Sequence, residues 1–230
     1  MESFLKERKG IENRVYLTED FRMESTPVGF KGIHLLPSQM AALAALVDIE
    51  KTRTIKCESG VFYRTSGAIL SEPFGSGKTI VILGLILLNR IPTPYSQIVP
   101  DRDKIQTKRV CSNDKLLQCN LIIVSSSCLD QWIDAIKNFT KLRTFSIGHY
   151  NEMLKFIKLL ETGAVNNYDI ILLKNGTITG KLGFADDNEV NNRSTIKVME
   201  TLTKKYMWSR IIFDDFDTVN SGGDLNSIFN

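Results

Sequence analysis

The stretch Gly67-Ala-Ile-Leu-Ser-Glu-Pro-Phe-Gly-Ser-Gly-Lys-Thr79 carries the strongest structural signal in the chain. A short apolar run leads into a turn with glycines at 75 and 77, and the apolar run Ile80–Leu88 follows. Strand, glycine-rich turn and helix in this order are the context that a phosphate-binding loop requires. The glycines let backbone N–H groups point at phosphate oxygens, and the helix N-terminus adds partial positive charge. The sequence therefore predicts a site for ATP or another nucleoside triphosphate.

The residues of this loop have different expected roles in binding the nucleotide. Lys78 is expected to bridge the terminal phosphates, and the hydroxyl of Thr79 is expected to reach Mg²⁺. Glu72 stands where the pattern G-x-x-x-x-G-K-[ST] begins with glycine. The expected ATP-binding residues of the loop are Glu72, Pro73, Phe74, Gly75, Ser76, Gly77, Lys78 and Thr79.

A second signal is the segment Ile211-Ile-Phe-Asp-Asp-Phe-Asp217 near the end of the sequence. Its apolar triplet predicts a buried strand, and ligands of open α/β sheets collect at the carboxyl ends of such strands. A phosphate-loop enzyme needs a carboxylate there to hold Mg²⁺ and a base to orient the attacking water. We expect Asp214 to hold the Mg²⁺, partly through water, and Asp215 to be the base.

Apolar strands alternate with amphipathic helices along most of the chain. Strands are expected before the loop and at Leu121–Val124, Arg143–Ile147, Tyr168–Leu173 and Trp208–Asp215. Helices are expected after the loop, from a cap at Ser38, and at Leu129–Phe139, Asn151–Leu160 and Thr195–Tyr206. This alternation predicts an α/β fold with a mostly parallel sheet covered by helices on both faces.

Length and composition limit the number of domains and the class of protein. The chain has 230 residues, 43% of them hydrophobic, with a formal charge of +3. We expect an N-terminal arm at 1–33 and one domain at 34–230, with insertions near 90–120 and 174–195. The apolar run Ile80–Leu88 is shorter than the roughly 20 residues that span a bilayer. The four cysteines show no paired spacing, so they are expected to be reduced thiols of an intracellular protein.

Five segments, in this order, resemble the N-terminal RecA-like lobe of superfamily 2 helicases, within them the SNF2-like branch. An acidic residue is usual at the position of Glu72 in the motif I of that branch. Trp208 matches a tryptophan that precedes motif II. The five segments are Leu36-Pro-Ser-Gln39, Ile69–Thr79, Ile123–Trp132, Tyr168–Leu173 and Asp214–Asp217.

The resemblance implies partners and roles for this chain. Gln39 is expected to read the adenine edge of ATP, and Ser125, Ser126 and Ser127 are expected to contact nucleic acid. DNA is the expected nucleic acid, without exclusion of RNA. The resemblance also implies a second RecA-like lobe, which the 230 residues do not contain, so that hydrolysis by the lobe alone is expected to be absent or very slow. The divergent motifs look most like SNF2-type helicases of large DNA viruses.

One departure from the family bears on catalysis. Asp215 stands where the family has glutamate, and its side chain is one methylene shorter. Two functions other than that of an ATP-driven helicase stay open. One is a nucleotide-gated binding module, such as a viral transcription subunit, with weak or lost hydrolysis. The other is an unrelated P-loop kinase, which would leave Gln39 and Trp132 unexplained.

Overall fold

The computed structural model describes residues 25–56, 62–65, 67–91, 96–101, 104–109, 116–175, 177–178, 193–194 and 206–214. The chain divides into two compact units. The first unit is Met1–Pro27 with His34–Leu85, and the second is Val28–Ile33 with Ile86–Asn230. The phosphate loop belongs to the first unit, and Asp214 belongs to the second.

The first unit contains a long helix whose start differs from the expected one. Its elements are α2 (Pro37–Thr52), the antiparallel pair β1 (Thr54–Lys56) and β2 (Phe62–Arg64), and most of α3 (Lys78–Leu88). Ser38 was expected to cap α2, but the helix begins at Pro37, because the fixed φ of proline suits the first helical position. The side chain of Gln39 serves the cap, since its Oε1 accepts a hydrogen bond from Leu36 N at 3.0 Å.

The strand expected before the phosphate loop does not form. Residues 67–73 are assigned neither strand nor helix, and the Ile69 side chain is 94% exposed. A strand needs a neighbour that pairs with its backbone groups, whereas the Gly67 N–H is bonded locally to Thr65 Oγ1 at 3.1 Å. The glycine-rich turn and the helix after it form as expected.

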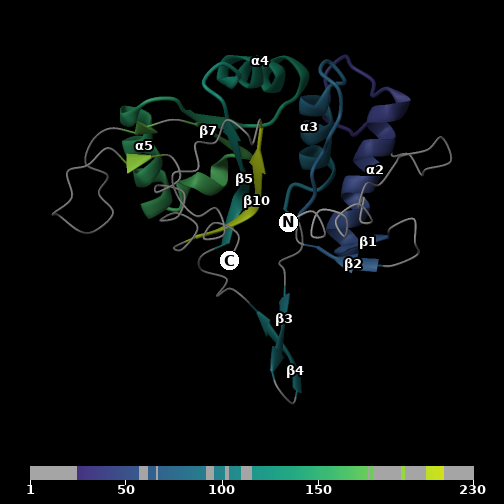
Figure 1. Ribbon diagram of the computed structural model, residues 1–230. Coiled ribbons are helices and arrows are strands. Elements are labelled where there is room, and N and C mark those ends of the chain that lie inside the picture. Colours follow the sequence, from purple (N-terminus) through teal and green to yellow (C-terminus); the bar gives the residue numbers. More distant parts are fainter. Residues whose placement is uncertain are drawn as a thin grey trace, which may run out of the picture. The chain divides into compact units, whose positions relative to one another are not determined.

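The second unit is built on a four-stranded sheet of order β10-β5-β7-β6. Figure 1 labels β5, β7 and β10 of this sheet. All neighbouring strands of this sheet are parallel, as expected for the α/β class. Its strands are β5 (Leu116–Val124), β6 (Thr144–Ile147), β7 (Ile170–Lys174) and β10 (Met207–Phe213). β5 starts earlier than the expected Leu121, because Cys119 and Asn120 are also fully buried in the sheet.

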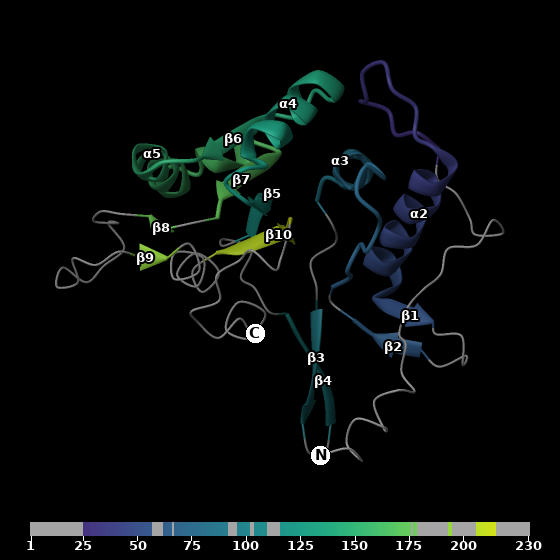
Figure 2. The ribbon, with the colours of Figure 1, turned by 45° about the horizontal axis from the view of Figure 1, so that its top comes forward.

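Two helices connect the strands of this sheet (Figure 2). α4 (Leu129–Phe139) leads from β5 to β6, and α5 (Tyr150–Glu161) leads back from β6 to β7. β7 lies between β5 and β6, so the two crossovers run in opposite directions across the sheet. Since such crossovers are right-handed, α4 and α5 cover opposite faces. The expectation of helices on both faces is therefore confirmed.

The core of the second unit lies between α5 and one face of the sheet. Alternate residues of β5 point to this face, as a strand period of two requires. The ring of Phe156 on α5 stacks on Trp208 with centroids 6.1 Å apart. The cluster comprises Leu117, Cys119, Leu121, Ile123, Ile147, Met153, Phe156, Ile157, Leu160, Val165, Ile171, Leu173 and Trp208.

Two further strand pairs lie within the segments expected as insertions. β3 (Ser96–Asp101) pairs with β4 (Lys104–Arg109), and β8 (Thr177–Ile178) pairs with β9 (Arg193–Ser194), both antiparallel. Residues 195–205 of the expected helix Thr195–Tyr206 lie outside the described part of the chain, as do residues 1–24 of the expected arm. No helix among the described residues is long and apolar enough to cross a lipid bilayer.

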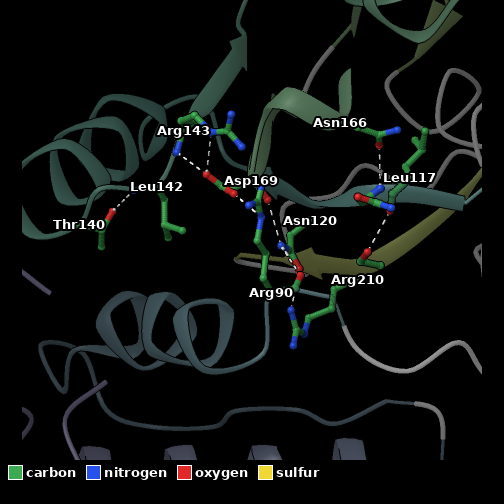
Figure 3. Close-up of polar contacts among 11 residues, drawn as sticks. Arg90, Leu117, Asn120, Thr140, Leu142, Arg143, Asn166, Asp169 and Arg210 are labelled. Carbon is green, nitrogen blue, oxygen red and sulfur yellow. Dashed lines mark hydrogen bonds and ion pairs between the residues drawn. The ribbon is translucent and has the colours of Figure 1, made fainter. Parts of the chain in front are cut away.

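A polar network is buried where β7 begins, as Figure 3 shows. Asp169 precedes β7 and is 4% exposed. Its carboxylate pairs with Arg90 and accepts a hydrogen bond from the backbone N–H of Arg143 at 2.7 Å. The Arg143 guanidinium lies 3.4 Å from the same carboxylate. Two cations and a backbone N–H thus stabilise the buried charge of Asp169.

Asn120 and Arg210 extend this network across the sheet (Figure 3). Asn120 is fully buried in β5, and its Nδ2 donates to Asp169 O at 3.0 Å. Arg210 of β10 donates from Nη1 to Asn120 Oδ1 at 2.7 Å and from Nη2 to Asn89 O. Asn89 directly follows α3, so the network joins the end of that helix to β5, β7 and β10.

The thiol of Cys119 gives a first testable prediction. Burial raises the pKa of Cys119 from 9.0 to about 12, with Arg90 opposing and Asp169 adding to the rise. Because only the thiolate reacts readily, we expect Cys119 in the folded protein to resist alkylation at pH 8, whereas the half-buried Cys128 reacts. Peptide mapping by mass spectrometry after a timed alkylation measures both. Faster labelling of Cys119 than of Cys128 would contradict the prediction.

The same shift gives stability a pH dependence of known sign. The folded pKa of Cys119 lies above the unfolded value of 9.0. Above that pH the unfolded chain loses the proton while the folded chain keeps it. The contribution of this thiol is therefore complete below about pH 9 and is lost as the pH rises toward about 12.

Candidate functional site

The turn before α3 has the backbone of a phosphate loop. Gly75 and Gly77 have φ angles of +78° and +84°, in the left-handed region that favours glycine. A Cβ atom at Gly77 would overlap Nε2 of Gln39 and displace that amide, and the positive φ of Gly77 would strain any other residue. Ser76 Oγ is buried and has no hydrogen-bond partner among the described residues. This conformation leaves polar groups of the loop available for phosphate oxygens.

Lys78 is the first residue of α3 and bonds back to the loop. Its Nζ donates to Glu72 O at 2.9 Å and to Pro73 O at 3.1 Å. It also lies 5.3 Å from the ring centroid of Phe74, whose side chain is 98% exposed. The first turn of α3 carries no acidic residue that would oppose an anion. The charge and the backbone of this loop therefore fit the phosphates of ATP.

Gln39 lies beside the phosphate loop, on the first turn of α2. Its Nε2 donates to Ser76 O at 2.9 Å, while its Oε1 accepts from Leu36 N. The first unit thus brings the amide predicted to read adenine to the loop predicted to hold phosphate. The contact with adenine itself stays a prediction.

Asp214 follows the end of β10, as the sequence predicts. Its backbone N–H donates to Ile123 O of β5 at 2.9 Å. Its side-chain Oδ2 accepts a hydrogen bond from Trp132 Nε1 of α4 at 2.7 Å. The carboxylate therefore lies at the carboxyl edge of the parallel sheet, where ligands of α/β proteins collect. Asp215 lies outside the described residues.

The serine loop, Ser125–Ser127, lies at the same edge of the sheet because it follows β5. The hydroxyls of Ser125 and Ser127 are 3.0 Å apart, and Ser126 Oγ donates to Asn175 O at 3.2 Å. Asn175 follows the next strand, β7, and its N–H donates to Val124 O at 2.6 Å. Ser126 and Ser127 are exposed. The loop is therefore held by the sheet and open to a ligand.

The side chains predicted to bind Mg²⁺ carry oxygen atoms, which are the ligands that this ion takes in proteins. The hydroxyl of Thr79 belongs to the first turn of α3, and the carboxylate of Asp214 belongs to the second unit. Mg²⁺ is typically bound by one or two carboxylates together with substrate phosphates, and not by a protein cage. The described part of the chain holds no group of three or more His, Cys, Asp or Glu side chains that could bind a metal, and the Mg²⁺ site stays a prediction.

Sequence reasoning missed two sets of polar contacts in the second unit. It did not find the hydrogen bond between Trp132 and Asp214, which are 82 residues apart. It also missed the network of Asn120, Asp169 and Arg210. A signal for the network exists, because a buried strand seldom carries Asn or Arg unless they are paired.

A phosphate loop before a helix and a parallel sheet with an aspartate at its carboxyl edge are the parts of a P-loop nucleotide-binding protein. The model of the SNF2-related domain family matches residues 22–223. The chain belongs to this family.

Individual relatives agree with this assignment. The chain is 28% identical over 183 residues to the "Uncharacterized ATP-dependent helicase IRC20" of Saccharomyces cerevisiae, an alignment that covers 74% of this chain and 11% of that protein. It is 23% identical over 167 residues to the "Putative helicase R592" of Acanthamoeba polyphaga mimivirus, covering 62% of this chain and 20% of that protein. The chain thus spans a small part of either relative.

Among solved structures, the chain matches the "Sulfolobus solfataricus SWI2/SNF2 ATPase core in complex with dsDNA" with 16% identity and a TM-score of 0.41. The match covers 93% of this chain and 37% of that one.

Proposed function

We propose that this chain is the ATP-binding lobe of a nucleic-acid-dependent ATPase, which couples ATP hydrolysis to movement on DNA when it is joined to a second RecA-like lobe. The observation that carries the proposal is the phosphate loop. Gly75 and Gly77 adopt left-handed backbone conformations, Lys78 opens the helix, and Gln39 reaches the same loop. A P-loop kinase has no evident use for Gln39 at this position.

Each site residue has a separate proposed role in binding ATP or in its hydrolysis. Lys78 and the loop amides bind the β- and γ-phosphates, and Gln39 selects adenine. Thr79 and Asp214 supply oxygen ligands for Mg²⁺, which when bound neutralises charge on the transferring phosphate. Asp215 orients the attacking water. The shorter side chain of Asp215 displaces that water, and a misplacement of about 1 Å can cost on the order of 100-fold in rate.

DNA is the proposed track, and the serine loop is its proposed contact. Protein contacts to a nucleic-acid backbone use hydroxyls and backbone N–H groups, and Ser126 and Ser127 are exposed hydroxyl-bearing residues at the sheet edge. The second lobe would supply an arginine, a contribution typically worth about 10³- to 10⁵-fold in rate. We therefore expect this lobe alone to bind nucleotide and to hydrolyse it very slowly or not at all.

DNA-stimulated hydrolysis is the test of this function. We expect the native full-length protein to release phosphate from ATP at least about tenfold faster with duplex DNA, and Asp214→Asn to lower that rate by about 100-fold or more. Phosphate release with and without DNA measures both. Turnover that ignores DNA but responds to a small acceptor would favour the kinase. Nucleotide binding without turnover would favour a nucleotide-gated binding module, which the aspartate at position 215 also suits.

A further inference from the structure

The indole of Trp132 is bonded to the carboxylate that follows β10. Its Nε1 donates to Asp214 Oδ2 at 2.7 Å, and the Trp132 side chain is almost fully buried. A hydrogen bond to an ionised acceptor is roughly twice as strong as a bond between neutral groups. The bond is also directional, so it restrains the orientation of the Asp214 carboxylate as well as its position.

The rest of Asp214 is restrained by the sheet. Its backbone N–H is bonded to Ile123 O, which fixes the main chain against β5. Among the described residues, no group other than the Trp132 indole donates to its side chain, so within that part of the chain Trp132 sets the direction of the carboxylate. With Oδ2 held by the indole, Oδ1 is the oxygen presented to a further ligand.

Trp132 is also connected to the serine loop through backbone hydrogen bonds. Its backbone N–H donates to Cys128 O at 3.0 Å, and the Cys128 N–H donates to Ser125 O at 3.1 Å. Trp132 thus lies one helical turn beyond the residue that closes the serine loop. A displacement of that loop moves the first turn of α4 and the indole with it, because packed elements shift as units.

We propose that Trp132 is a positioning residue, which orients Asp214 and transmits a displacement of the serine loop to this carboxylate. The inference rests on the proposed function, since it takes Asp214 as the Mg²⁺ carboxylate and the serine loop as the nucleic-acid contact. Nucleic acid at Ser125–Ser127 then shifts the indole, and the indole sets the carboxylate for hydrolysis. ATP turnover is coupled in this way to occupancy of the track.

Trp208 provides the matched control. It is the other of the two tryptophans in the chain, and it is buried like Trp132. Its Nε1 has no hydrogen-bond partner among the described residues. Replacement of Trp208 by phenylalanine therefore removes no such bond, whereas Trp132→Phe removes the bond to Asp214.

Fluorescence tests the contact without nucleotide or metal. In the Trp208→Phe variant, Trp132 is the sole tryptophan, and Asp214→Ala is expected to shift its emission maximum because the charged acceptor of the indole is lost. Duplex DNA is expected to shift the same emission. In the Trp132→Phe variant, Asp214→Ala should leave the emission of Trp208 unchanged. An emission maximum of Trp132 that does not change when Asp214 is replaced would overturn the proposal. This test does not depend on the folding of Trp132→Phe.

Kinetics of the native full-length protein test the coupling. Trp132→Phe is expected to lower the DNA-stimulated kcat by about tenfold at an unchanged KM for ATP, since it removes orientation and not binding. Trp208→Phe should change neither, with both variants checked for folding by circular dichroism. Equal losses in the two variants would overturn the inference. Absence of DNA stimulation in the unchanged protein would instead overturn the proposed function.

Discussion

Calorimetric titration of this chain with ATP and Mg²⁺ is expected to show binding that Lys78→Ala weakens by roughly 100-fold. Lys78 is the cation of the phosphate loop, and its Nζ donates hydrogen bonds to the carbonyls of Glu72 and Pro73 in the same loop. These carbonyls are weak partners for an ammonium compared with a phosphate anion. We therefore expect the lysine to exchange these carbonyls for the terminal phosphates when ATP binds.

Two controls make this titration specific. Lys51 is exposed in the last turn of α2, in the same unit, so Lys51→Ala removes an equal charge away from the loop and should leave binding unchanged. GTP should bind more weakly than ATP if Gln39 reads the base. Equal affinity of the intact chain and Lys78→Ala would reject the phosphate loop as the binding site.

Asn120→Leu is expected to lower the free energy of unfolding by about 3 kcal/mol. Asn120 is fully buried, so leucine fills a similar space but makes none of its hydrogen bonds. Arg210 Nη1 loses a buried acceptor at 2.7 Å, and Asp169 O loses a donor at 3.0 Å. A buried charge that loses an acceptor has no access to water in exchange.

Urea unfolding followed by circular dichroism measures this effect. The matched control is Gln118→Leu, the same exchange of an amide for an apolar side chain two residues earlier on β5. Gln118 is exposed, so its replacement should change the free energy of unfolding by less than about 0.5 kcal/mol. Equal effects of the two replacements would mean that the network adds little to stability.

Local sequence patterns were sufficient to predict helices α4 and α5 of the second unit. The sequence predicts a helix at Leu129–Phe139, and α4 has these bounds. It predicts another at Asn151–Leu160, and α5 extends it by one residue at each end. Both helices have a clear apolar stripe, which the 3.6-residue period reveals without knowledge of the partner.

Predictions failed where the deciding interaction is distant in sequence. Gln118 and Asn120 interrupt the apolar run of β5, so the start of that strand was missed. The polarity of Asn120 is compatible with a buried strand only because Asp169 and Arg210 satisfy it, 49 and 90 residues away. The bond between Trp132 and Asp214 is hidden for the same reason. Short spacings predict elements, whereas the pairing of polar groups depends on how those elements meet.

The two bonds of the Gln39 amide have a consequence for molecular selectivity. One proton of Nε2 and one lone pair of Oε1 are used, which leaves one donor and one acceptor in a known orientation. The amide cannot rotate by half a turn without breaking both bonds, so its remaining donor and acceptor are not interchangeable. Fixing a glutamine side chain costs up to about 2 kcal/mol in conformational entropy. The amide is already ordered by its two bonds within the protein, so the proposed contact with adenine would not require this entropic cost again.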